Sequence, residues 1–187
     1  MKHPVLASAL MVAALAWAAH PSLAQDKAKG DAAQLASASQ AALKELYAGV
    51  PIAKALGTEA VAILVFPKVT KAGLGIGGQY GEGTLLKKGT AAAYYKTTGA
   101  SFGLQAGGQK YGYAMFFMSD KALGQLDNAN GFEVGVGPSV VVVDEGMGKS
   151  TTTTTLKDDV YAFIFGQKGL MAGLGIQGNK ITKITPK

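Results

Sequence analysis

The sequence predicts an α+β protein in which N-terminal helices pack on a strongly bent antiparallel β-sheet or barrel. Alanine-rich segments with helical spacing come first, and from residue 60 onward short apolar runs alternate with glycine-containing turns. Glycine at every second position over residues 73–77 leaves one face of a strand without side chains. A related pattern at residues 172–178 suggests similar roles for the first and last strands, which could close on each other.

The first 24 residues have the features of a secretory signal peptide. A short basic start precedes an apolar run over residues 5–19, and Ser22-Leu23-Ala24 fits the small-x-small cleavage rule. We expect cleavage after Ala24 and export to the periplasm or the medium; a retained N-terminal anchor is the alternative. Removal of this 24-residue signal peptide would leave 163 of the 187 residues. We expect these to form a flexible start over residues 25–30 and a single domain over residues 31–187.

The composition excludes several kinds of chemistry. The chain has no Cys, and both of its His residues, His3 and His20, lie in the predicted signal peptide. Thiol chemistry, soft-metal sites and serine catalysis with a His base are therefore excluded from the mature chain. All 18 basic residues are Lys, against 12 acidic residues. Lys without Arg favours diffuse attraction to an anionic surface, and we expect no nucleic-acid partner.

Two helices and a buried strand are expected before the glycine-rich stretch. A capping signal begins a helix over residues 31–48, which ends at Gly49, and a short helix follows over residues 51–56. The continuous apolar run at residues 60–66 predicts a strand buried on both faces, ending at Pro67.

The remainder is expected to be mostly β. A hairpin turn is predicted at residues 87–89, a short helix capped by Ser119 at residues 120–126, and a kink at residues 137–138. The threonine tract at residues 151–155 favours extended structure. The expected strands cover residues 80–88, 91–97, 101–107, 111–118, 132–143, 160–165, 170–176 and 181–184.

Several motifs resemble functional sites but lack the required context. Residues 73–78 satisfy GxGxxG, yet glycine continues to residue 83, so no helix can begin there to hold a pyrophosphate. Residues 148–150 resemble the end of a phosphate-binding loop, but five threonines follow instead of a helix. Adjacent carboxylates at residues 144–145 and 158–159 leave a carboxylate hydrolase as an alternative. We expect no enzymatic activity, metal or cofactor.

Lysines around the helices and the glycine-rich strand are the candidate binding residues. If they converge, they form a footprint for an acidic phospholipid surface; the alternative is a solvated surface that keeps the protein soluble. The candidates are Lys27, Lys29, Lys44, Lys54, Lys68, Lys71, Lys87 and Lys88.

Four separate stretches resemble the SYLF domain family. They are FPKVTKAG at residues 66–73, the glycine-rich run 75–83, GASFGLQAG at residues 99–107 and KGLMAG at residues 168–173. The resemblance covers residues 30–184. It implies a non-enzymatic lipid-binding module that associates with phosphoinositides and other acidic phospholipids, and by analogy with yeast relatives it implies actin as a partner. The alternative is an envelope structural or protein-interaction domain that uses the glycine-rich β face.

Overall fold

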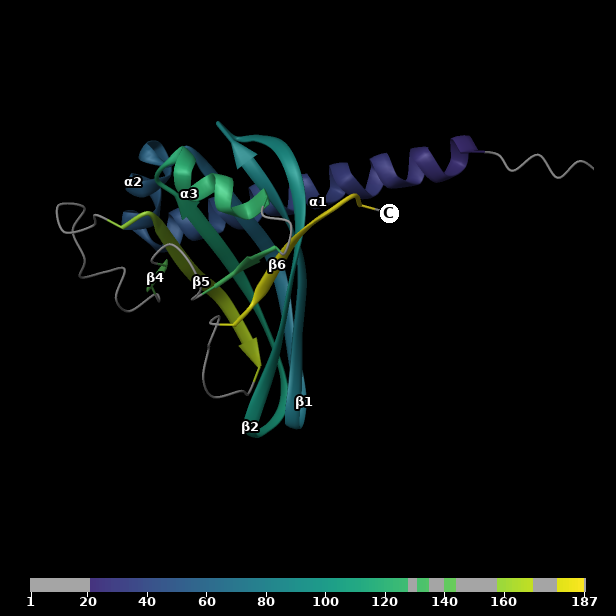
Figure 1. Ribbon diagram of the computed structural model, residues 1–187, viewed down its shortest axis with the longest axis vertical. Helices are drawn as coiled ribbons and strands as arrows, with labels where there is room; N and C mark the ends of the chain where they lie inside the picture. The colour runs from purple at the N-terminus through teal and green to yellow at the C-terminus, as the bar shows by residue number, and fades with distance from the viewer. Residues whose placement is uncertain (1–20, 128–130, 135–139, 144–157, 170–177, 187) are drawn as a thin grey trace, which may run out of the picture.

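The computed structural model describes residues 21–127, 131–134, 140–143, 158–169 and 178–186. The helices gather at one end of the molecule, and a long β-hairpin extends away from them (Figure 1). The predicted α+β class with a strongly bent sheet is confirmed. In chain order the elements are α1 Pro21–Gly49, α2 Pro51–Glu59, β1 Ala62–Lys87, β2 Thr90–Phe117, α3 Asp120–Gly124, the 3-10 helix η1 Gln125–Asp127, β3 Phe132–Glu133, β4 Val140–Val143, β5 Val160–Gly169 and β6 Lys180–Ile184.

Strand β2 is the centre of the sheet. On one side it pairs antiparallel with β1 along nearly its whole length, from Ala62 opposite Phe117 to Lys87 opposite Thr90. On its other side, the first part of β2 pairs with β6 and the second part with β5, both antiparallel. Strand β3 continues the sheet beyond β6, and β4 lies parallel to β5. The parallel β4–β5 pair departs from the all-antiparallel sheet that the sequence predicts.

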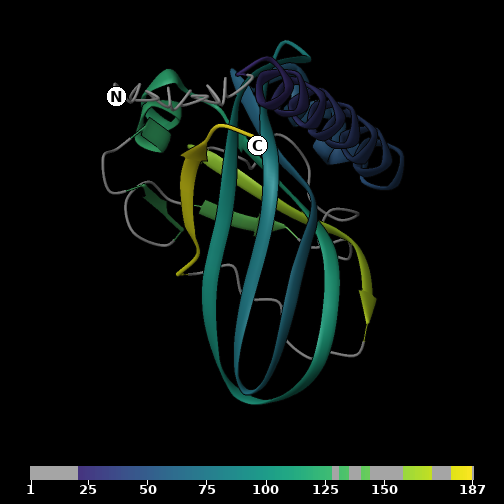
Figure 2. The same ribbon diagram turned by 90° about the vertical axis from the view of Figure 1, so that its right-hand side faces the viewer.

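The β1–β2 hairpin folds back on itself at a glycine-rich crease. The crease consists of residues 73–77 of β1 and residues 101–107 of β2, where the pairing register shifts. Both strands run from the helical end to the crease, bend, and return (Figure 2). A side chain at Gly73 would collide with the backbone of Gly77, so this bend requires glycine. The crease divides each strand into two limbs, residues 62–72 and 78–87 in β1, and residues 90–100 and 108–117 in β2.

The folded hairpin encloses the first of two apolar cores. A Cβ atom at Gly81, in the second limb of β1, would lie 2.9 Å from the carbonyl oxygen of Lys68 in the first limb. The sequence predicts a strand face without side chains. Part of that face, at Gly81, allows the first limb of β1 to approach the second limb closely. The core inside the fold includes Leu64, Phe66, Tyr113, Met115 and Phe117.

The second core lies between the helices and the outer face of the sheet. Ile63 and Val65 belong to it, whereas the alternating Leu64 and Phe66 point into the first core. The strand buried on both faces, predicted at residues 60–66, is therefore confirmed. The two helices and the residue that joins them, Val50, contribute Ala42, Leu43, Leu46, Val50, Ile52, Ala53 and Leu56 to this outer core.

Helix α1 bridges the two limbs of β1. The fully buried hydroxyl of Ser39 is 3.2 Å from the carbonyl oxygen of Val65 in the first limb and 3.1 Å from Oγ1 of Thr84 in the second. From the next residue of the helix, Nε2 of Gln40 donates to the carbonyl of Gly89 in the hairpin turn. These contacts fix the C-terminal half of α1 over the place where the limbs meet.

Several predicted boundaries are corrected. Helix α1 begins at Pro21 instead of residue 31, so residues 25–30, expected to be flexible, lie in its first turns. Strand β1 does not end at Pro67, because Pro67 falls in a register shift between Phe66 and Val69 where no ladder hydrogen bond is needed. The predicted short helix over residues 51–56 continues to Glu59.

The three strands predicted between residues 91 and 118 are one strand. Gly99 and Gly108 lie in the gaps between these predicted strands, but both positions pair with β1. At Gly99 the missing side chain instead makes room for Asn179 and Gln79. The hairpin turn at residues 87–89 is confirmed, with Lys88 and Gly89 at positive φ, and so is the cap, because Ser119 Oγ accepts from the backbone N–H of Ala122.

Some predictions remain untested. The last described strand, β6, pairs with β2 and β3, whereas the closure on the first strand is predicted for the pattern at residues 172–178. The glycine pattern at residues 172–178, the kink at residues 137–138, the threonine tract and the strand predicted at residues 170–176 fall wholly or mainly outside the described residues.

Candidate functional site

Three lysines from adjacent strands share one exposed face of the sheet. Lys110 on β2 lies directly opposite Lys168 on β5 and opposite Thr70 on β1, and Lys68 is two residues before Thr70. Cross-strand partners point to the same face. All four side chains are exposed. We call this surface, together with the small exposed residues Ala72 and Gly108, the lysine face.

The lysine face continues the outer face of the sheet beyond the part that the helices cover. Ala114 and Phe116 on β2 belong to the outer core, and two-residue steps along the strand lead from them to Lys110 and Gly108. The alternate residues Gln109 and Tyr111 point inward and are buried. Alternation along the strand therefore places lysines and small residues on the exposed face, and buried side chains on the face that points into the interior.

The electrostatics of the lysine face favour an anionic partner. Like charges directly opposite each other on neighbouring strands repel, and Lys110 and Lys168 are such a pair. At the helical boundary of this region, Oε1 of Glu45 lies near Gly166. A phosphate or carboxylate group placed between the lysines would relieve the repulsion.

The structure disperses the lysines predicted from the sequence. Lys68 is on the lysine face, whereas Lys71 is 3% exposed and points into the fold. Lys44 and Lys54 are exposed on α1 and α2, and Lys87 and Lys88 are exposed at the hairpin turn. Lys27 and Lys29 belong to the first turns of α1, where side chains are outside the described part of the structure.

Sequence reasoning missed Lys110 and Lys168. Lys110 lies between the strands that the sequence predicts at residues 101–107 and 111–118, and Lys168 enters the sequence analysis only within a motif of the family resemblance. The signal that could have found them is the pairing of β2 with β5, which depends on contacts far apart in the sequence.

A buried polar cluster lies on the inner side of the crease. The hydroxyl of Tyr111 donates to Oε1 of Gln79 over 2.7 Å, and Nε2 of Gln79 donates to Oδ1 of Asn179. Burial raises the pKa of Tyr111 to about 12. Among the described side chains, buried polar atoms without a hydrogen-bond partner include Gln109 Oε1 and Asn179 Nδ2. This cluster makes the interior near the crease polar, in contrast to the apolar core near the helices.

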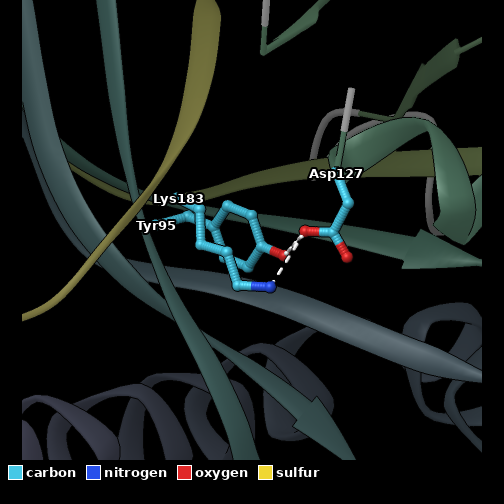
Figure 3. Close-up of polar contacts among 3 residues, drawn as sticks. All are labelled: Tyr95, Asp127 and Lys183. Atoms are coloured by element: carbon cyan, nitrogen blue, oxygen red, sulfur yellow. Dashed lines mark hydrogen bonds and ion pairs between the residues drawn. The ribbon is translucent and has the colours of Figure 1, made fainter. Parts of the chain in front are cut away.

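A second polar group fixes the 3-10 helix to the sheet. In Figure 3 the side chains of Tyr95 on β2 and Lys183 on β6 converge on Asp127 of η1. Lys183 is the main cause that holds the pKa of Asp127 below its usual value. Burial, with the hydrogen bond to Asp127, raises the pKa of Tyr95. The group joins three elements and is not part of the lysine face.

In the described part of the chain, no helix combines the length and the apolar character needed to cross a bilayer.

The fold defines the class of protein: an α+β module built on a creased β-hairpin with helices over one face. Residues 98–185 match the family model described as Ysc84, the Las17-binding protein actin regulator. The matched residues include most of β2 and nearly all of the described chain after it, and over these residues the SYLF resemblance seen in the sequence is confirmed. No curated protein matches the chain.

Proposed function

We propose that this protein is a lipid-binding module that associates with acidic phospholipids, including phosphoinositides, through its lysine face. The observation that carries the proposal is the alignment of Lys68, Lys110 and Lys168 on one exposed face of three adjacent strands. The family is linked to lipid binding and actin regulation, which agrees with this proposal.

The expected affinity of the lysine face is modest. Each Lys near an anionic membrane surface contributes about 1 kcal/mol at moderate ionic strength, so three contribute about 3 kcal/mol. The small residues between the lysines, Thr70, Ala72 and Gly108, let the backbone approach a headgroup layer closely. Because nearby charges are screened within about 10 Å at 0.1 M salt, binding should weaken steeply as salt rises.

The proposed role is non-enzymatic. Every Asp and Glu side chain that the structure describes is at least partly exposed. A hydrolase built on carboxylates would instead raise the pKa of one of them by burial in a cleft. We also propose that residues 1–24 direct export, so that the membrane surface met by the protein lies outside the cytoplasm.

A second candidate function uses the same face against a protein. The family description names a Las17-binding actin regulator, so a protein with an acidic surface is an alternative occupant; for an exported chain this would be an envelope protein. Actin itself is supported only by analogy with the family.

Sedimentation with vesicles tests the proposal. The chain, with and without residues 1–24, would be mixed with phosphatidylcholine vesicles containing 0 or about 30% phosphatidylglycerol over a salt series. We expect binding only to the anionic vesicles, with a steep loss as salt increases. Equal binding to both compositions, or no binding at low salt, would refute the proposal.

Charge reversal then tests the location. Lys110→Glu changes the local charge by two units and should weaken vesicle binding by roughly 30-fold, about 2 kcal/mol. The control is Lys121→Glu, an exposed position on α3 that changes the net charge by the same amount. If both variants lose binding equally, net charge and not the lysine face is responsible.

A further inference from the structure

A groove with a volume of about 590 Å³ lies between α1 and the sheet, and none of its lining residues belongs to the lysine face. Its floor crosses three strands, with Tyr80 and Glu82 on β1, Lys96 on β2 and Ile184 on β6, and α1 contributes Asp31 and Leu35. Clefts of about 300–1,000 Å³ are typical of small-molecule sites. The groove is therefore large enough for an organic ligand.

Opposite charges lie side by side on the floor of the groove. Glu82 and Lys96 are directly opposite each other on β1 and β2, so their side chains leave the same face of the sheet. The hydroxyl of Tyr80 donates to Oε1 of Glu82 over 2.5 Å and orients this carboxylate. Asp31 adds a second negative charge from the α1 side.

Apolar surface adjoins these charges. Leu35 and Ile184 line the groove, as does Tyr80, which is 50% exposed. Ile76, which is 69% exposed, lies on the same face of β1, separated from Tyr80 by the bare position Gly78. Ile76 and Tyr80 are the two large apolar side chains with high exposure in the described part of the chain, and together they form a stripe that leads from the groove toward the crease.

We propose that this groove binds one zwitterionic phospholipid, with its phosphate at Lys96, its amine at Glu82 and Asp31, and an acyl chain along Leu35, Tyr80 and Ile184. Two carboxylates against one ammonium give the lining a net negative charge, which disfavours a purely anionic headgroup. A purely cationic ligand would be repelled by Lys96. A headgroup that carries both charges, joined to an apolar chain, complements all of these groups.

This site is distinct from the lysine face, and its test needs no membrane. The probe is dihexanoyl-phosphatidylethanolamine, kept below its micellar concentration and titrated into the full chain while amide and side-chain NMR shifts are followed. We expect saturable shifts at Tyr80, Glu82, Lys96 and Ile184. Dihexanoyl-phosphatidylglycerol should bind at least 10-fold more weakly, and so should phosphoethanolamine, which lacks the acyl chains.

Matched variants locate the headgroup. Lys96→Met and Glu82→Gln should each weaken binding of the probe by about 5- to 10-fold, whereas Lys121→Met and Glu133→Gln, exposed positions on α3 and β3, should not change it. Thermal unfolding of each variant shows whether it is folded. A fold failure in Glu82→Gln would leave Lys96→Met, and the comparison of ligands on the unmodified chain, to decide the proposal.

The outcomes separate this proposal from the one made for the lysine face. Lys110→Glu should lose vesicle binding and retain the soluble lipid. Equal affinity for the two dihexanoyl lipids, binding of phosphoethanolamine as tight as that of the lipid, or tighter binding of a hexalysine peptide would each overturn the zwitterionic lipid assignment. The absence of saturable shifts in the groove would overturn it as well.

Discussion

The hydroxyl of Tyr95 donates a hydrogen bond over 3.0 Å to Oδ1 of Asp127, from a residue that is only 1% exposed. The same carboxylate oxygen is 3.0 Å from Nζ of Lys183, whose side chain is 57% exposed. One carboxylate thus joins the interior of β2 to η1 and to β6. The two contacts differ in burial, and their energetic contributions should differ accordingly.

Removal of the Tyr95 hydroxyl should destabilise the protein more than removal of the lysine. Tyr95→Phe eliminates a hydrogen bond to a charged group and should lower the free energy of unfolding by about 1.5–3 kcal/mol. Lys183→Met removes an exposed ion pair and should cost less than about 1 kcal/mol. Urea denaturation measures both values, and a larger loss in Lys183→Met would contradict this assignment.

The close approach of the two limbs of β1 predicts a cost for any side chain at Gly81. In Gly81→Ala the new Cβ atom would lie 2.9 Å from Lys68 O and from Val69 Cγ2, so the limbs must separate. We expect a loss of about 1–3 kcal/mol, typical of overpacking. Gly124→Ala is the control, because nothing lies within 4 Å of the new atom there and alanine favours the helix. Its stability should be unchanged or higher by up to about 1 kcal/mol.

Ser39 should control how firmly α1 is attached. Ser39→Ala leaves the buried carbonyl of Val65 and the hydroxyl of Thr84 without this partner, at an expected cost of about 1–3 kcal/mol. Hydrogen exchange of α1 amides should accelerate. Ser37→Ala, at an exposed position of the same helix, should leave both quantities nearly unchanged. Equal protection of α1 in the two variants would show that Ser39 does not anchor the helix.

Stability should decline at alkaline pH because tyrosines are buried. Burial raises the pKa of Tyr111 to about 12, above the ordinary value of about 10 that it has in the unfolded chain. The unfolded chain therefore loses its proton first, and the stabilisation present below pH 10 is lost as pH rises toward 12. The expected slope is up to about 1.4 kcal/mol per pH unit for this residue. Urea denaturation from pH 8 to 12 tests this, and Tyr111→Phe should show a smaller slope.

The sequence correctly predicts those helix ends and turns that depend only on residues close together in the chain. Ser119 caps α3, Pro51 begins α2, and Lys88 with Gly89 forms the hairpin turn. Glycine inside a strand is ambiguous, because the same residue permits a turn or a close approach. At Gly99 the approach of Asn179 decides between the two, and Asn179 is 80 residues away in the sequence.

The candidate site shows the same limit. Lys68 was identified because it flanks the glycine-rich strand, but its neighbours Lys110 and Lys168 depend on the register of three strands. Lys71 was grouped with Lys68 by proximity in the sequence, although the structure buries it. A one-residue shift in strand register moves every side chain to the opposite face, so the identity of surface lysines requires the pairing itself.

The crease restricts changes in the lengths of the two strands that form it. Because the bend in β1 must coincide with the bend in β2, both strands must keep the same number of residues between the hairpin turn and their bends, apart from the compensating irregularities already present. Insertion or deletion of a single codon in one arm would offset the two bends and reverse the orientation of the side chains beyond it. Length variation should therefore be tolerated in this hairpin only as matched changes in both arms.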